Sequence, residues 1–151
     1  MLRSKILASG VAVVLACTLS ACEKPNPEAT VTAGTSSAHG RALCWAQAAA
    51  ISAQSCAETL VAGAINNPDT PTVALVSDET VGISVDPKVA EFGWYAAIGG
   101  QRLTTKAIYG TYYRFTFPQT DIPDTGFSLQ IIAQNAQNSA RGIWVFKLVN
   151  K

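Results

Sequence analysis

Four cysteines and a single histidine are the side chains of this sequence with the clearest potential for covalent or metal chemistry. The cysteines are Cys17, Cys22, Cys44 and Cys56, the histidine is His39, and the one methionine is the initiator. A thiol can accept a lipid, pair with a second thiol or bind a metal. No Cys-x-x-Cys occurs, and one histidine without an internal methionine does not complete a zinc, copper or haem ligand set. We therefore expect no metal and no other cofactor.

The first 21 residues are typical of an export signal. Arg3 and Lys5 precede an apolar stretch at 6–19, which ends in the small residues Ser20 and Ala21. This apolar run is shorter than the roughly 20 residues that a helix needs to cross a bilayer. We therefore expect residues 1–21 to be a cleaved signal peptide.

The end of this signal contains a motif that could attach a lipid. The run Leu19-Ser20-Ala21-Cys22 resembles the bacterial lipobox, which implies diacylglyceryl transfer to the Cys22 thiol, cleavage before Cys22 and acylation of the new N-terminus. An ordinary secretory signal with an incidental cysteine is the alternative. The lipobox predicts a protein held by lipid on the extracytoplasmic face of the cell membrane. Residues 22–28 then form the lipidated cysteine with a proline-containing tether, and 29–151 the folded domain.

Cys44 and Cys56 are the pair that would remain outside the membrane. Eleven residues separate them, and in an oxidising compartment we expect a disulfide, which would contribute about 3 kcal/mol in the chain-entropy model. Residues 41–63 have good helix propensity, but twelve positions of one helix span about 18 Å, against Cα separations near 5.5 Å in a disulfide. We therefore expect a strand near Cys44, a turn or short helical loop, and a return near Cys56.

The rest of the chain is rich in short β segments separated by turn residues. Residues 34–40 are small and polar and predict a loop that contains His39, and Gly99-Gly100 predicts a hairpin turn. This pattern predicts an all-β fold, an immunoglobulin-like antiparallel β-sandwich. The expected strands are 29–33, 72–76, 80–85, 93–98, 103–108, 112–117, 127–133 and 143–149.

Aromatic residues supply the expected core of this sandwich. Strand alternation at 112–117 places Tyr113, Phe115 and Phe117 inward and leaves Tyr112 and Arg114 exposed. Two tryptophans, at positions 94 and 144, would anchor the core if they lie on neighbouring strands.

Charge argues against several classes of partner. The chain is 48% hydrophobic and 14% charged with a formal net charge of +1, so no basic stripe for nucleic acid is evident. Without Arg3 and Lys5, nine basic residues face ten acidic ones. This balance predicts no electrostatic attraction to anionic lipid beyond the lipid anchor on Cys22.

Residues that could catalyse a reaction are sparse. His39 falls in the expected loop, and no Gly-x-Ser-x-Gly sequence occurs. The acids fall mostly in turns, where short carboxylates often make local hydrogen bonds. We therefore expect a protein that is not an enzyme, a binding or accessory module for a protein complex of the cell envelope or membrane. The alternative is an envelope small-ligand carrier or hydrolase with a site built from the loop residues Asp69, Asp78, Asp121 and Asp124.

Three segments resemble a known family. They are 81–94, from Val81-Gly82-Ile83 to Trp94, then 112–117, and Ala140-Arg141-Gly142-Ile143-Trp144. With the lipobox and the two nearby cysteines, they resemble uncharacterised actinobacterial lipoproteins grouped as a domain of unknown function. The resemblance would cover about 29–151. It implies a compact extracytoplasmic β domain and no established activity.

Overall fold

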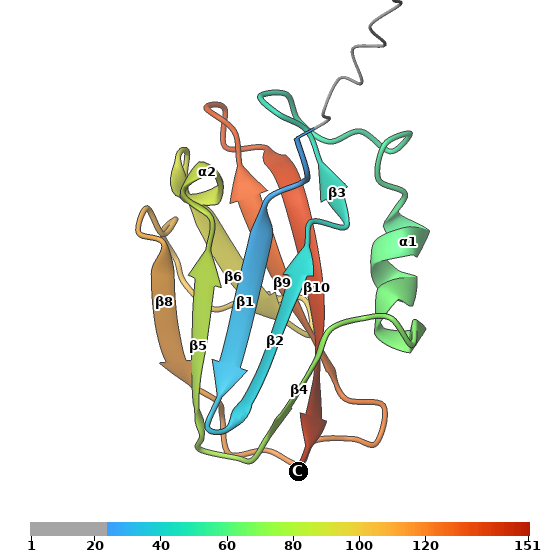
Figure 1. Cartoon of the computed structure of the whole chain (residues 1–151), viewed down its shortest axis with the longest axis vertical. Helices are drawn as coiled ribbons and strands as arrows, with labels where there is room; N and C mark the ends of the chain where they lie inside the picture. Colours follow the sequence, from blue (N-terminus) through green and yellow to red (C-terminus); the bar gives the residue numbers. More distant parts are fainter. Residues whose placement is uncertain (1–23) are drawn as a thin grey trace, which may run out of the picture.

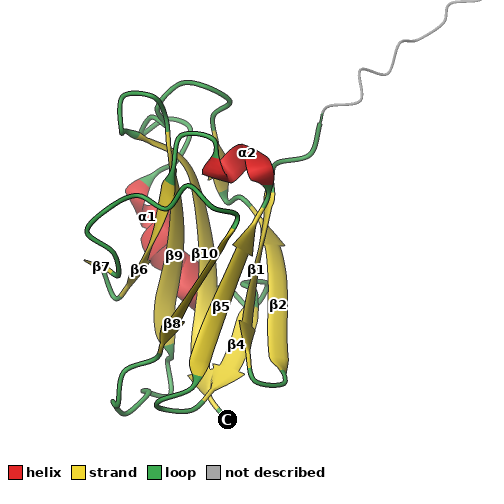
Figure 2. Cartoon of the chain, turned by 90° about the vertical axis from the view of Figure 1, so that its left-hand side faces the viewer, coloured by secondary structure: helices red, strands yellow, loops and turns green. Residues whose placement is uncertain are grey.

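Two β-sheets packed face to face form the body of the molecule. The computed structural model describes residues 24–151, and Figures 1 and 2 show the two layers from perpendicular directions. The predicted all-β sandwich is confirmed. The expected signal peptide (1–21) and Cys22 lie outside the described residues. Within 24–151, no helix has the length and apolar character needed to cross a membrane.

The first sheet has four antiparallel strands in the order β2-β1-β5-β8. Every second side chain of β1 is buried, as expected for a strand with one face on the core. The bounds are β1 Glu28–Ala33, β2 Ser36–Arg41, β5 Thr80–Val85 and β8 Tyr112–Thr116.

The second sheet has the order β3-β10-β9-β6-β7, with β4 also paired to β10. Its pairs are antiparallel except that β4 runs parallel to β10. Three short helical segments complete the fold: α1 Glu58–Gly63, η1 Ala64–Asn66 and α2 Pro87–Ala90. The strands are β3 Cys44–Trp45, β4 Thr72–Leu75, β6 Trp94–Ile98, β7 Gln101–Arg102, β9 Phe127–Gln134 and β10 Ala140–Asn150.

The core lies between the sheets and contains both expected tryptophans. Trp94 and Trp144 are fully buried, but β9 separates their strands, so they are not on neighbouring strands. Phe117 is also fully buried, and Tyr113 and Phe115 pack against the core. The alternation predicted for this segment is therefore confirmed.

Two segments differ from the sequence-based prediction. Residues 36–41 are not loop but strand β2, because their backbone pairs with β1 over its whole length, and only the turn at Gly34 interrupts the two strands. His39 is therefore an exposed strand residue. The return strand expected at 103–108 is wrong: the partner of β6 is the shorter β7, which lies before this range, and residues 103–108 make one isolated bridge, between Ile108 and Trp94.

The segment after β2 folds back as expected. Cys44 on β3 is bonded to Cys56, with a Cα–Cα distance of 5.7 Å. The predicted disulfide is confirmed, and the helical propensity of the region is realised only after Cys56, in α1.

Candidate functional site

The residues that enter the sandwich are fixed to it before the first strand begins. The carbonyl oxygen of Pro27 accepts hydrogen bonds from Trp144 Nε1 at 2.9 Å and from the amide of Ala42 at 3.1 Å. Asn26 Nδ2 donates to the Ala42 carbonyl at 3.4 Å. Pro27 is buried. The fold therefore holds the chain from Asn26 onward, four residues after Cys22.

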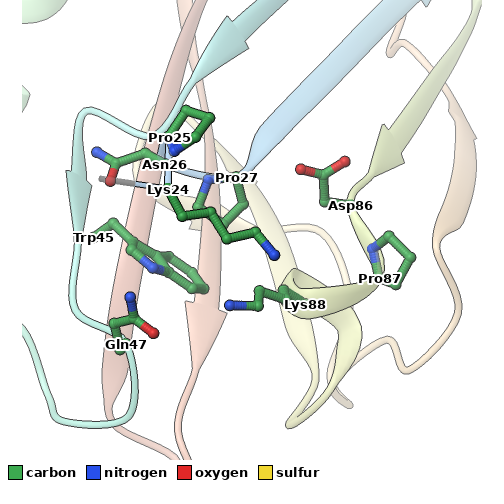
Figure 3. A pocket seen from close by; sticks show the side chains of 9 residues that line it. All are labelled: Lys24, Pro25, Asn26, Pro27, Trp45, Gln47, Asp86, Pro87 and Lys88. Atoms are coloured by element: carbon green, nitrogen blue, oxygen red, sulfur yellow. The ribbon is translucent and has the colours of Figure 1, made fainter. Parts of the chain in front are cut away.

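A groove lies at the same end of the sandwich, which we call the tether end. Residues 24–27 form one wall, Trp45 and Gln47 after β3 form the second, and residues 86–88 at the start of α2 form the third. The cavity measures about 440 Å³. Figure 3 shows Lys24 and Lys88 reaching into it from two different walls. The groove thus combines an indole and several proline rings with two ammonium groups.

The charges around the groove are not balanced locally. Neither Lys24 nor Lys88 forms an ion pair within residues 24–151. Asp86, the acid on the groove wall, already accepts a hydrogen bond from the Glu28 amide at 2.8 Å. An anionic group entering the groove would meet two ammonium groups with no ion-pair partner among the described residues.

Arg141 connects two walls of the groove, the one formed by Trp45 and Gln47 and the one formed by residues 86–88. Its side chain is buried, donates from Nη1 to the Gln47 carbonyl at 2.8 Å, and donates from Nη2 to the Lys88 carbonyl. The guanidinium lies between the rings of Trp45 and Phe92, at 4.8 Å and 5.0 Å. A buried cation is costly unless its donors are satisfied, so these contacts fix the loop after β3 against α2.

The partners of Arg141 were not predictable from the sequence. Nη2 lies 3.5 Å from Glu91 Oε2, while Nε has no hydrogen-bond partner among the described residues. The strand register shifts between Ala140 and Gly142, so the alternation of β10 does not fix the direction of the Arg141 side chain. Its burial comes from contacts with the loop after β3 and with residues 88–92 at α2.

A second hollow on the side of the sandwich brings His39 and Asp69 together. It measures about 460 Å³ and lies between the end of β2 and the loop after η1. The Thr70 hydroxyl in the same hollow donates to the Ala64 carbonyl. The hollow therefore contains a histidine and a carboxylate from segments that the sequence did not connect.

The other acids of the alternative site lie at the opposite end of the sandwich. Asp78 accepts a hydrogen bond from Gln119 at 2.7 Å, and Asp121 and Asp124 lie in the loop between β8 and β9. Residues 24–151 contain no group of three or more His, Cys, Asp or Glu placed to hold a metal ion. The structure therefore does not gather Asp69 with the other three acids.

The side of the domain that carries α1 exposes apolar side chains and few charges. None of the residues of α1 is buried, and Leu60 and Leu43 are 48% and 37% exposed. Glu58 is the one charged residue between positions 42 and 68. We call Leu43 and residues 57–63 the α1 strip.

Comparison of the chain with protein-family models, with curated proteins and with solved structures found no match. The resemblance to actinobacterial lipoproteins therefore stays a prediction.

Proposed function

We propose that this protein is a lipid-anchored, non-catalytic binding module on the extracytoplasmic face of the cell membrane, acting as an accessory to an envelope or membrane protein complex. The observation that carries the proposal is the fixed entry of the chain at Asn26. Only four residue steps separate it from Cys22, so a lipidated Cys22 lies at most about 14 Å from the folded domain. Such a spacer would hold the domain at the bilayer surface.

The disulfide supports the extracytoplasmic part of this proposal. Cys44 and Cys56 are paired, and such bonds persist mainly in oxidising compartments. The bond ties the first residue of β3 to a residue two positions before α1, so it also stabilises the surface that carries the α1 strip.

The α1 strip is the surface that we assign to the protein partner. Exposed apolar side chains with one acid among them fit a partner surface of low charge. A domain tethered within about 14 Å of the bilayer presents its long side to neighbouring membrane proteins. The proposed partner is therefore another protein of the same membrane.

The anchor is tested by replacing Cys22 with serine in the exporting host. The Cys22→Ser protein should leave the membrane fraction, and the wild type should carry an acyl mass on the peptide that begins at residue 22. Cys17→Ser is the matched control, because it makes the same chemical change within the expected leader. Membrane retention of Cys22→Ser without any acyl mass on the wild type would refute the anchor.

The partner surface is tested with a charge placed in the strip. Tagged wild-type protein cross-linked in membranes should recover one partner in fixed ratio, and Leu60→Asp should lose it. Val76→Asp is the control, because Val76 is 44% exposed and lies in the turn between β4 and β5, away from the strip. Equal recovery with both variants would exclude the strip as the contact surface.

The hollow with His39 and Asp69 favours the second candidate function, a small-ligand carrier or hydrolase. His39 and Asp69 line the same hollow, and a histidine in such a hollow can act as a general base toward a bound substrate. Turnover of simple ester substrates by the purified protein, abolished by His39→Ala and kept by the exposed-site variant Arg114→Ala, would support it. Equal rates for these proteins and for buffer would remove it.

A further inference from the structure

Charged residues are unevenly distributed along the sandwich. Among residues 24–151, basic residues predominate at the tether end, where Lys24, Arg41, Lys88, Lys106 and Arg141 face Glu28, Asp86 and Glu91. Acidic residues predominate at the opposite end, where Asp78, Glu79, Asp121 and Asp124 face Lys147 and Lys151. The small net charge of the chain therefore hides a separation of charge.

Two of the acids described at the tether end are paired with arginines. Glu28 pairs with Arg41 at 3.2 Å, and Glu91 lies 3.5 Å from Arg141. Asp86 accepts a hydrogen bond from the Glu28 amide and keeps its negative charge. The groove therefore contains one carboxylate and two lysines that have no ion-pair partner within residues 24–151, and its net charge is positive.

The length of the domain determines which of its charged residues can interact electrostatically with a bilayer at one end. β10 has 11 residues, which corresponds to about 35 Å at the rise of an extended strand. The Debye length at physiological ionic strength is about 8 Å. A surface at one end of the sandwich is therefore screened from the acids at the other end, and net charge is the wrong quantity for predicting attraction.

We propose that the tether end docks on the headgroups of an anionic bilayer, with lipid phosphates entering the groove between Lys24 and Lys88. The inference rests on the proposed lipid anchor, because the short connection to Cys22 is what brings this end to the surface. Docking of this end holds the long axis of the sandwich roughly perpendicular to the membrane surface. It also revises the expectation that electrostatic attraction to anionic lipid adds nothing to the lipid anchor.

Aromatic side chains at the same end fit this occupant. Trp45 lines the groove and is half-buried, and Tyr109, three residues before the start of β8, is 68% exposed. Trp and Tyr are enriched at membrane interfaces, where one part of the ring system is apolar and the other is wet. Lysines in such a layer keep their ammonium groups at the level of the phosphates.

Trp45 also provides the means of testing the orientation. Trp94 and Trp144 are fully buried in the core, so Trp45 is the tryptophan of residues 24–151 that a quencher in the headgroup layer can approach. Acylated mature protein purified from membranes is reconstituted into phosphatidylcholine vesicles, with or without phosphatidylglycerol. A lipid with a nitroxide on its headgroup serves as the quencher, and a Trp45→Phe protein identifies the contribution of Trp45.

The expected result is strong quenching of Trp45 that depends on phosphatidylglycerol and weakens with salt. Lys88→Glu should lower the ratio of docked to undocked protein about tenfold to thirtyfold, since each charge near such a surface contributes about 1 kcal/mol. The side chain of Lys88 can be changed without removing the carbonyl that Arg141 binds. Arg114→Glu, an exposed charge reversal on β8, is the control and should retain full quenching.

The outcomes separate the two proposals. A protein that carries no acyl mass and does not float with the vesicles refutes the anchor. A protein that floats with the vesicles, but whose Trp45 quenching is absent, independent of phosphatidylglycerol or equally reduced in Lys88→Glu and Arg114→Glu, refutes the docking while leaving the anchor intact.

Discussion

Arg141 provides the sharpest test of how the tether end is held together. Its side chain is 1% exposed and donates to two backbone carbonyls, one in the loop after β3 and one in α2. Two variants separate the effect of the charge from that of the donors. Arg141→Lys keeps the charge but loses the planar fork, whereas Arg141→Met keeps much of the volume and removes the charge.

The expected magnitudes follow from the contacts. A hydrogen bond from a charged donor contributes about 1.5–3 kcal/mol. A lysine ammonium at this position serves one of the two carbonyls and still bears the cost of burial, so Arg141→Lys should lose about 3 kcal/mol. Arg141→Met leaves both carbonyls without a donor, at about 1–3 kcal/mol each, but it no longer buries a charge, and the net loss should be about 1 kcal/mol.

Thermal unfolding followed by circular dichroism, with the disulfide intact, measures these differences. A loss of about 3 kcal/mol in a domain of this size lowers Tm by roughly 10 °C. Arg114→Lys, an exposed substitution of the same kind, should change the stability by less than about 0.5 kcal/mol. An Arg141→Lys protein as stable as this control, or an Arg141→Met protein clearly less stable than Arg141→Lys, would show that the buried guanidinium does not act as described.

Three further perturbations test other parts of the fold. Replacing Cys44 and Cys56 together with alanine should lower the denaturant midpoint by an amount equivalent to about 3 kcal/mol; an unchanged midpoint in non-reducing buffer would argue that the bond contributes nothing. Trp144→Phe keeps most of the buried ring but removes the donor to the Pro27 carbonyl, so it should lower the free energy of unfolding by about 1–3 kcal/mol and speed amide exchange at the start of β1; unchanged exchange would show that this hydrogen bond does not hold the entering chain. The hydrogen bond from Lys151, helped by the amide of the turn before β5, holds the pKa of Glu79 below its ordinary value of 4.5. Its stabilising effect is present above that value and is lost as the pH falls through the folded-state pKa, so urea midpoints of the wild type and Glu79→Gln should converge in acid and differ at neutral pH; a constant difference would refute the linkage.

Local sequence patterns predicted much of the architecture because they act over short distances. Alternation of side chains identified β5, β8, β9 and β10 within a few residues. β2 was missed, because its serines, glycine and histidine have turn chemistry and only the hydrogen bonds to β1 make it a strand.

The candidate site could be anticipated only in part. The pair of cysteines expected in an oxidising compartment was enough to predict the bond between Cys44 and Cys56, and the length of a helix over their spacing was enough to predict that the segment between them folds back. Nothing local distinguished Lys24 and Lys88 from other lysines or indicated that His39 and Asp69 share a hollow.

The sequence by itself thus determined the β-sandwich, the disulfide and the expectation of a lipid on Cys22, since each depends on residue type and short spacing. Only the tertiary structure decided that Arg141 is buried beneath a groove and that the basic residues gather at the end where the chain enters. The physical reason is that burial and the local electrostatic field depend on which distant segments contact each other. Local sequence patterns do not specify those contacts.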